Sequence, residues 1–292
     1  MKFSGIIFTV YLLISCSGIK RTVESELPKL VEVSNTKIDS SFAEIHVISK
    51  DYTKVQKEEK SQETIEAFNQ ILSEESIEIH ELWDELLKVH VSDEGNVNYK
   101  KFKTDHDKLQ SYINSLDRIY SNEDFQLQSK DETLAFWINA YNAMTIDLIL
   151  RHYPIKSIKD IDRPWEQRLW KLSNKWYNLD EIEHQILRKM DEPRIHFAIV
   201  CASYSCPKLL NEAYKADTLE EQLTNATKEF LNDLNRNNIS ENSLELSKIF
   251  QWFSKDFKED GSIISFLNKY SEIEIPENAK IKYKDYNWDL NE

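Results

Sequence analysis

The chain has 292 residues, of which 40% are hydrophobic and 11% are aromatic. This length fits one large domain, or a domain with an appendage, because single hydrophobic cores stop growing at about 250–300 residues. The formal net charge is -14, from 51 acidic and 37 basic residues. An acidic surface repels a phosphate backbone, so we expect no nucleic-acid partner. With only 4 glycines and 6 prolines, the chain favours helices over a turn-rich all-β fold.

The first residues have the pattern of a bacterial lipoprotein signal. Lys2 supplies a positive charge before an apolar run at residues 6–14, which is too short to span a bilayer as a mature helix. The run leads into LISC, where a signal peptidase would cut before Cys16 and the thiol would carry diacylglycerol. We predict a signal peptide at residues 1–15 and a membrane anchor on Cys16. The residue after it, Ser17, fits delivery to the outer membrane of a bacterial cell envelope. An ordinary secretory signal or an uncleaved anchor is the alternative.

Residues 16–62 are rich in Ser, Thr, Glu and Lys, with scattered apolar residues and no clear period. We predict a flexible tether here, because such a composition buries too little apolar surface to fold alone. The alternative is that part of it, such as FAEIHVI at residues 42–48, adds an edge strand. The remainder, residues 63–292, is predicted to form a single α+β domain.

Apolar residues at three- and four-residue spacing predict amphipathic helices in much of this domain. The predicted helices cover residues 65–72, 76–91, 131–154, 217–234, 244–257 and 262–270, and a further helix carries Leu109, Tyr112, Ile113 and Leu116 on one face. The helix at 131–154 is apolar on most sides, which predicts a central and buried position. Pro154 is expected to stop it.

Four segments predict extended structure. They are a turn and short strand at residues 93–99, a hairpin with strands at 169–173 and 175–179, a buried strand at the apolar run 195–201, and an alternating strand at 279–290. Between them, Asn178 followed by Glu181 resembles a capping box that opens a helix carrying His184. The sum is an α+β fold, with a helix-rich domain around a small sheet.

Several long, aromatic-rich motifs resemble the domain-of-unknown-function 547 family. They are VNYKKF (97–102), FWINAYNAMTI (136–146), IEH (182–184), DEPRIHFAIVCASYSCPKL (191–209) and KYKDYNWDLN (282–291). The resemblance covers roughly residues 78–291. One departure is Glu192, which stands between Asp191 and Pro193 where such families usually have Asp-Pro-Arg. The resemblance implies no established reaction, and a kinship with papain-like or transglutaminase-like cysteine hydrolases is a fold-level analogy.

Cys201 and Cys206 lie in HFAIVCASYSCPKL and allow several interpretations. They can form a disulfide, since an exported protein meets an oxidising compartment. One of them can be a thiol nucleophile. Together with His184 and His196 they have the residue types of a zinc site, although the spacing fits no finger-like pattern. Inert burial and a switchable disulfide are the remaining alternatives.

The nucleophile hypothesis prefers Cys206. In a strand at 195–201, Cys201 would end the strand and be simply buried. Pro207 suits the first position of a short helix, which would leave Cys206 at its N-cap. Amide donors at a helix start favour a thiolate and lower the pKa of the cysteine. His184 and His196 are the candidate bases.

Four further residues are candidates around this centre. Asn139 and Asn142 share one helix face and can orient a base, donate to an oxyanion, or tie loops together. Arg194 can clamp a substrate carboxylate or form a salt bridge. Trp137 can stack on a sugar or peptide, or belong to the core.

The leading hypothesis is a cell-envelope thiol hydrolase or transferase that acts on amide or peptide bonds. Cys206 would be the nucleophile, His184 or His196 the base, and Asn139 an orienting or oxyanion group. The alternative is a non-catalytic envelope binding domain with a structural Cys201–Cys206 disulfide. Either protein would contact a membrane through Cys16 and take a peptide or cell-envelope ligand, and neither is expected to need a cofactor or a metal.

Overall fold

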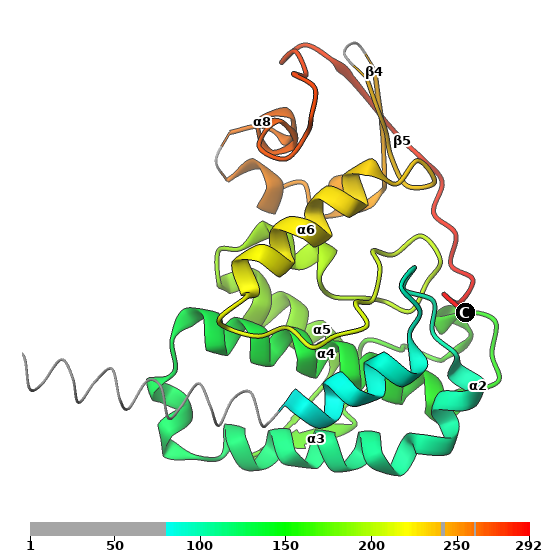
Figure 1. Cartoon of the computed structure of the whole chain (residues 1–292), viewed down its shortest axis with the longest axis vertical. Coiled ribbons are helices and arrows are strands. Elements are labelled where there is room, and N and C mark those ends of the chain that lie inside the picture. The colour runs from blue at the N-terminus through cyan, green and yellow to red at the C-terminus, as the bar shows by residue number, and fades with distance from the viewer. Residues whose placement is uncertain (1–79, 241–242, 260) are drawn as a thin grey trace, which may run out of the picture. The chain divides into compact units, whose positions relative to one another are not determined.

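The computed structural model describes residues 80–240, 243–259 and 261–292. The predicted signal peptide, the lipid anchor at Cys16, the tether at residues 16–62 and the first predicted helix lie outside the described residues. In the described part, helices dominate and small sheets accompany them, so the fold is α+β, as predicted (Figure 1). None of the helices in this part has the length and hydrophobicity that a bilayer crossing requires.

Helix α4 (Lys130–His152) lies at the centre of the fold. A capping box opens it: the Ser129 hydroxyl accepts from the Glu132 N–H at 3.2 Å, and the Ser129 N–H donates to the Glu132 carboxylate at 2.7 Å. Every residue from 134 to 150 is buried, which explains why the helix is apolar on most sides. The predicted central helix is confirmed, and it ends two residues before Pro154.

A layer of helices packs against one side of α4. It comprises the helical residues 80–90, α2 (Tyr99–Phe102), η1 (Lys103–Asp105), α3 (His106–Tyr120) and η2 (Glu123–Leu127). The predicted apolar face of α3 is buried in its four residues Leu109, Tyr112, Ile113 and Leu116. Tyr112 stacks on Trp83 of the preceding helix, with ring centroids 5.7 Å apart. In Figure 1, α3 runs along α4, so these two helices frame the lower half of the molecule as drawn.

Two predicted turns are present as predicted. An antiparallel bridge between Val91 and Val97 closes the first, where Gly95 has φ +81°, a conformation that favours glycine. Strands β1 (Trp170–Leu172) and β2 (Lys175–Tyr177) form the second, an antiparallel hairpin with a two-residue turn. The hairpin leads into the elements that carry His184.

Asn178 begins the next helical stretch as predicted, because its side chain accepts a hydrogen bond from the Glu181 N–H at 2.8 Å. The Glu181 carboxylate pairs with Arg168 and Lys175 rather than completing a capping box. The stretch comprises α5 (Leu179–Glu181), the π-helical turn η4 (Ile182–Ile186) and the 3₁₀ turn η5 (Leu187–Lys189). A separate 3₁₀ turn, η3 (Ile158–Asp160), lies earlier in the chain, between α4 and the hairpin. A π-helical turn at this point sits in the segment that contributes Glu183 and His184.

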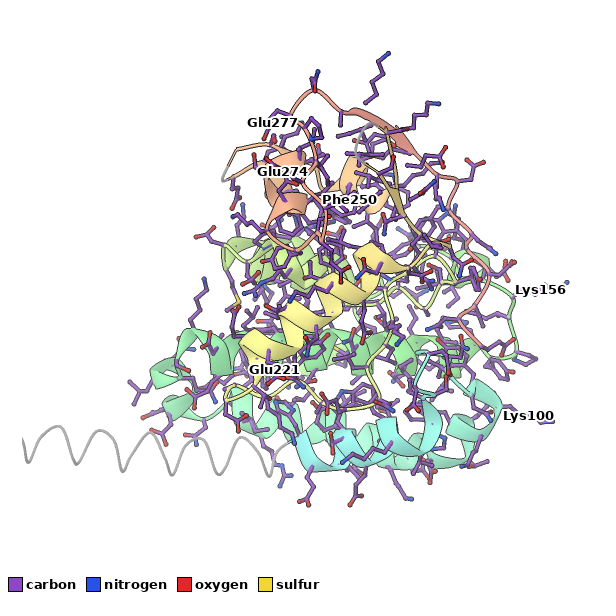
Figure 2. The ribbon with its side chains drawn as sticks, turned by 45° about the horizontal axis from the view of Figure 1, so that its top comes forward. Lys100, Lys156, Glu221, Phe250, Glu274 and Glu277 are labelled. Carbon is purple, nitrogen blue, oxygen red and sulfur yellow. The ribbon has the colours of Figure 1, made fainter. Side chains whose placement is uncertain are left out.

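The remaining described elements form a second hydrophobic cluster above α4 in Figure 1. They are α6 (Leu219–Asn232), β3 (Asn238–Ile239), β4 (Ser243–Leu246), α7 (Ile249–Trp252), η7 (Asp256–Lys258), α8 (Ile263–Asn268) and β5 (Lys280–Tyr283). The sheet has the order β3-β4-β5, with β4 antiparallel to β3 and parallel to β5. Figure 2 shows Phe250 inside this part and Glu221, Glu274 and Glu277 on its surface.

Three local predictions are wrong. Residues 195–201 are not a strand: the 3₁₀ helix η6 (Pro193–Phe197) is followed by irregular backbone. A short continuous apolar run marks burial, but its period does not separate a strand from a buried helical turn. No helix begins at Pro207, so Cys206 is not an N-cap. Residues 244–257 are not one helix, because β4 occupies their start.

Candidate functional site

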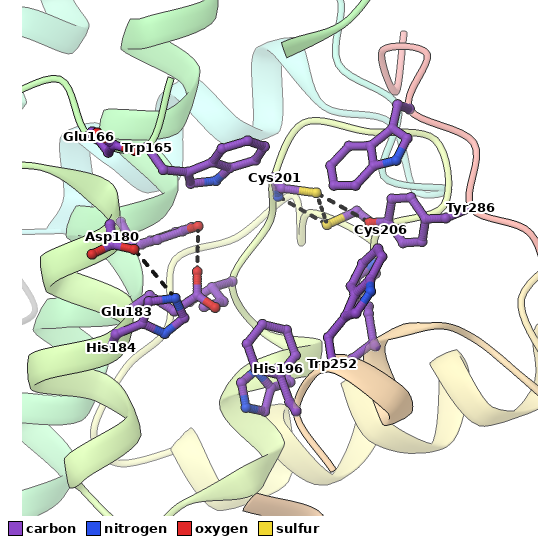
Figure 3. A pocket seen from close by; sticks show the side chains of 16 residues that line it. Trp165, Glu166, Asp180, Glu183, His184, His196, Cys201, Cys206, Trp252 and Tyr286 are labelled. Atoms are coloured by element: carbon purple, nitrogen blue, oxygen red, sulfur yellow. Dashed lines mark hydrogen bonds and ion pairs between the residues drawn. The ribbon is translucent and has the colours of Figure 1, made fainter. Parts of the chain in front are cut away.

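A cavity of about 330 Å³ lies between α4, the α5–η4 turn, α7 and the C-terminal segment after β5 (Figure 3). Its lining comprises Tyr141, Trp165, Glu166, Asp180, Glu183, His184, His196, Ile199, Cys201, Cys206, Pro207, Ile249, Trp252, Phe253, Tyr286 and Trp288. Four predicted site residues therefore meet here: both cysteines and both histidines. The cavity is the only place where the described structure brings these side chains together.

Cys201 is the acidified thiol of the pair. Its sulfur lies 3.1 Å from the Cys206 sulfur, 2.9 Å from the Ser203 hydroxyl and 3.3 Å from the Tyr286 hydroxyl. The hydrogen bond with Cys206, followed by those with Ser203 and Tyr286, lowers the pKa of Cys201 to about 6 against the opposing effect of burial. Burial keeps the pKa of the Tyr286 phenol well above its ordinary value, so Tyr286 remains a donor.

The pKa of Cys206 is shifted in the opposite direction. Burial and the neighbouring Cys201 thiol raise the pKa of Cys206 well above its ordinary value. Its sulfur accepts the Cys201 backbone N–H at 3.0 Å, and both cysteines are free thiols in this structure. The preference for Cys206 over Cys201 rested on a strand and a helix start that the structure does not contain. Of the two cysteines, Cys201 and not Cys206 therefore has the lowered pKa that a nucleophile would need.

The backbone before Cys201 is held by α4. The Asn142 amide donates to the Ala198 carbonyl at 2.9 Å and accepts the Val200 N–H at 2.9 Å. Asn142 is buried and does not line the cavity. It is thus a brace for the irregular segment that presents Cys201.

His184 lines the cavity with its imidazole about one-third exposed. Its Nδ1 lies 3.1 Å from an Arg188 guanidinium nitrogen, and its Nε2 lies 3.6 Å from an Asp180 carboxylate oxygen. Arginine only donates, so Nδ1 accepts and the neutral ring carries its proton on Nε2. His184 therefore presents a donor, and not a base, towards its remaining surroundings.

His196 is buried, and its imidazole already has a hydrogen-bond partner. Its Nε2 bonds to Asp256 at 2.8 Å, and its ring stacks on Phe253 with centroids 3.9 Å apart. Burial lowers the pKa of His196, even though the Asp256 hydrogen bond acts in the other direction. Asp256 also binds Arg188 through two hydrogen bonds of 2.6 and 2.7 Å. Within the described residues, neither histidine hydrogen-bonds to a cysteine sulfur.

The other three candidates lie outside the cavity lining. The Asn139 amide is satisfied on both sides by the Tyr214 backbone, at 2.8 and 3.0 Å. Arg194 is held by Glu192 and Glu220 and ties η6 to α6. Trp137 is buried among aromatic rings. These contacts match the structural alternatives for the three residues: Asn139 ties a loop, Arg194 forms salt bridges, and Trp137 belongs to the core.

Sequence reasoning did not single out five residues of the centre: Glu183, Ser203, Trp252, Tyr286 and Trp288. Glu183 stands beside His184 in the IEH motif, and Tyr286 and Trp288 stand in KYKDYNWDLN. These two motifs could have pointed to Glu183, Tyr286 and Trp288, because both motifs belong to the family resemblance. Among the described residues, no group of three or more His, Cys, Asp and Glu side chains is arranged to hold a metal ion.

Fold and site together define an α+β domain with an acidified thiol in an aromatic cavity. The family model described as "Protein of unknown function, DUF547" matches residues 125–231, which include both cysteines and both histidines of the cavity. The match supports a DUF547 domain in this part of the chain. No curated protein and no solved structure matches the chain.

Proposed function

We propose that this protein is a cell-envelope thiol hydrolase or transferase that acts on amide or peptide bonds, with Cys201 as its nucleophile. The observation that carries the proposal is a thiol with a pKa lowered to about 6 on the wall of a cavity of about 330 Å³. Such a thiol is mostly thiolate at neutral pH, and the thiolate is the form that attacks a carbonyl carbon.

The reaction balances with water as the only co-reactant. The Cys201 thiolate attacks the amide carbonyl, a C–S bond forms and the C–N bond breaks. The amine leaves with a proton from water, and the hydroxide so produced hydrolyses the thioester to a carboxylic acid and regenerates the thiolate. In a transferase, a second amine attacks the thioester in place of hydroxide.

In this proposal the histidines have other roles than the general base expected from the sequence. Cys201 is acidified by Cys206, Ser203 and Tyr286, so it ionises without a histidine partner. The His184 Nε2–H is the candidate donor to the carbonyl oxygen on which negative charge develops, in competition with the Asp180 carboxylate oxygen that lies 3.6 Å from Nε2. His196 supports the wall of the cavity through Asp256 and Phe253.

A non-catalytic envelope binding domain is the second candidate. It is favoured by the lack, among the described residues, of a histidine hydrogen-bonded to either sulfur, because a general base needs such reach. In this form the cavity binds a peptide or cell-envelope ligand without reaction, and the cysteines serve structure.

The envelope location rests on the sequence of the first residues. The positive charge, the apolar run and the small residue before Cys16 support lipidation of that thiol. Incorporation of a palmitate analogue that disappears in Cys16→Ser supports this location, and unchanged incorporation in that variant contradicts it.

Alkylation kinetics test the nucleophile. We expect iodoacetamide to label Cys201 with a pH midpoint near 6 and to leave Cys206 unlabelled, as mapped by peptide mass spectrometry. The Cys206→Ala variant should shift the midpoint upward, because it removes the largest of the stabilising hydrogen bonds. A midpoint near about 8.5, the value of a free thiol, sinks the proposal. Labelling that requires a reductant means a disulfide in the resting protein and favours the binding domain.

A further inference from the structure

The cavity has an uneven charge. Three of its lining residues are acidic, namely Glu166, Asp180 and Glu183, and none is Lys or Arg. The Cys201 thiolate adds a further negative charge to the same wall. A negatively charged ligand would find no cationic side chain on this lining, whereas a positively charged one would be attracted.

Glu183 is a buried carboxyl group without a cationic side chain in direct contact. Only 8% of the residue is exposed, and its hydrogen-bond partner is the neutral Tyr141 hydroxyl at 3.0 Å. No Lys, Arg or His among the described residues forms an ion pair with it. Burial raises the pKa of Glu183, although the nearby charges of His184 and Arg188 and the hydrogen bond from Tyr141 act in the other direction. A buried carboxylate is normally paired by a direct contact, and a ligand ammonium at Glu183 would supply that contact and favour the ionised form.

Aromatic rings form the wall near the sulfurs. Trp252 stacks on Trp288 with centroids 5.7 Å apart, and Tyr286 lies 4.6 Å from Trp288. Trp252 remains 46% exposed, so its ring is open to a ligand. The Lys159 ammonium already lies 4.5 Å from the centroid of the Trp288 ring, which shows that this cluster accepts an ammonium on a ring face. Figure 3 shows Glu183 and Trp252 on different sides of the same cavity.

We propose that the cavity binds a substrate ammonium group, with Glu183 as its counter-ion and the Trp252–Tyr286–Trp288 rings as its wall. The amide cleaved at Cys201 then belongs to a molecule that also carries a free amino group, as a lysine side chain does. This choice of substrate rests on the proposed function, but the binding of the ammonium does not require a reaction.

Three capped amino acids of similar size test the proposal on the full chain. N-acetyl-lysine N-methylamide carries the ammonium, the norleucine analogue replaces it with a methyl group, and the glutamate analogue carries a negative charge. We expect calorimetry to show the lysine compound binding about tenfold more tightly than the norleucine compound, and the glutamate compound binding least.

Glu183→Gln removes the charge and keeps an oxygen that can accept from Tyr141, so the variant should fold and lose the preference for lysine. Glu221→Gln is the matched control: it makes the same change of charge on the exposed surface of α6 and should keep the preference. Trp252→Leu should weaken binding of the lysine compound several-fold more than binding of the norleucine compound.

Equal binding of lysine and norleucine compounds overturns the inference, and so does a preference that survives Glu183→Gln. The two proposals fail separately. A lysine preference without an acidified Cys201 leaves an ammonium-binding domain and removes the hydrolase. An acidified Cys201 without a lysine preference leaves the hydrolase and removes the ammonium site.

Discussion

The acidity of Cys201 depends partly on a phenol from a distant part of the sequence. The Tyr286 hydroxyl lies 3.3 Å from the Cys201 sulfur and donates to a thiolate there. We predict that Tyr286→Phe, which keeps the ring, raises the midpoint of Cys201 alkylation by about one pH unit, because a hydrogen bond to a charged group contributes about 1.5–3 kcal/mol.

Tyr204→Phe is the control for that measurement. Tyr204 is 45% exposed and has no hydrogen bond to either sulfur, so its variant should keep the midpoint of the original protein. An unchanged midpoint in Tyr286→Phe would show that Cys206 and Ser203 alone acidify the thiol.

Asp256 is the residue on which the wall behind the cavity depends. It accepts hydrogen bonds from Arg188 and His196, and its side chain is 14% exposed. We predict that Asp256→Asn lowers the free energy of unfolding by about 2 kcal/mol at pH 7, because it leaves the partly buried Arg188 guanidinium without its carboxylate. Urea denaturation measures this. Asp285→Asn, at an ion pair whose carboxylate is fully exposed, should cost less than about 1 kcal/mol.

The same carboxylate gives the stability a pH dependence. Burial alone would raise the pKa of Asp256, but hydrogen bonds from Arg188 and His196 outweigh it and lower the pKa below its ordinary value of 3.8. A lowered pKa in the folded state stabilises the protein above pH 3.8 and loses that contribution as the pH falls further. As the pH is lowered below 4, the free energy of unfolding should therefore fall less in Asp256→Asn than in the original protein. An equal acid dependence in both proteins contradicts the assignment.

At the scale of elements, α4 fixes two different segments through the same side-chain chemistry. Asn142 braces the segment before Cys201, and Asn139 braces the Tyr214 backbone. We predict that alanine at either position lowers the free energy of unfolding by about 2–3 kcal/mol, because each change leaves buried backbone groups unsatisfied. Only Asn142→Ala should also slow the alkylation of Cys201 at pH 7. The same slowing in Asn139→Ala would show that general loosening, and not the brace, controls the thiol.

Elements with a clear period were predictable from the sequence, and elements fixed by tertiary contacts were not. Helices α3 and α4 and the β1–β2 hairpin follow the spacing of their apolar residues and their turn. Residues 195–201 are apolar throughout, which predicts burial but leaves the backbone to be decided by Asn142 and the packing around it. Strand β4 pairs with β3 and β5, and its four residues alternate polar and apolar, but this run is too short to be separated by its period from the helical spacing that follows it.

At the scale of the whole molecule, the candidate site was predictable only where its residues are close in sequence or lie in recognisable motifs. The cysteines and histidines were found in this way. Which cysteine is acidified depends on Ser203 and Tyr286, and nothing in the local pattern brings Tyr286 to Cys201. That approach comes from docking of the C-terminal segment, where the Asp289 backbone carbonyl accepts the Tyr204 backbone N–H at 2.7 Å and Leu290 forms a β-bridge with Ser203.

This connection gives the site an order of assembly. Tyr286 follows Cys201 by 85 residues, so the ribosome makes the thiol well before the phenol and the Trp288 ring that complete its surroundings. During that interval Cys201 lacks one hydrogen-bond partner and one wall of its cavity, and it resembles an ordinary, less reactive cysteine. A nascent or prematurely interrupted chain therefore carries no fully acidified thiol, and reactivity arises only when the C-terminal segment has docked.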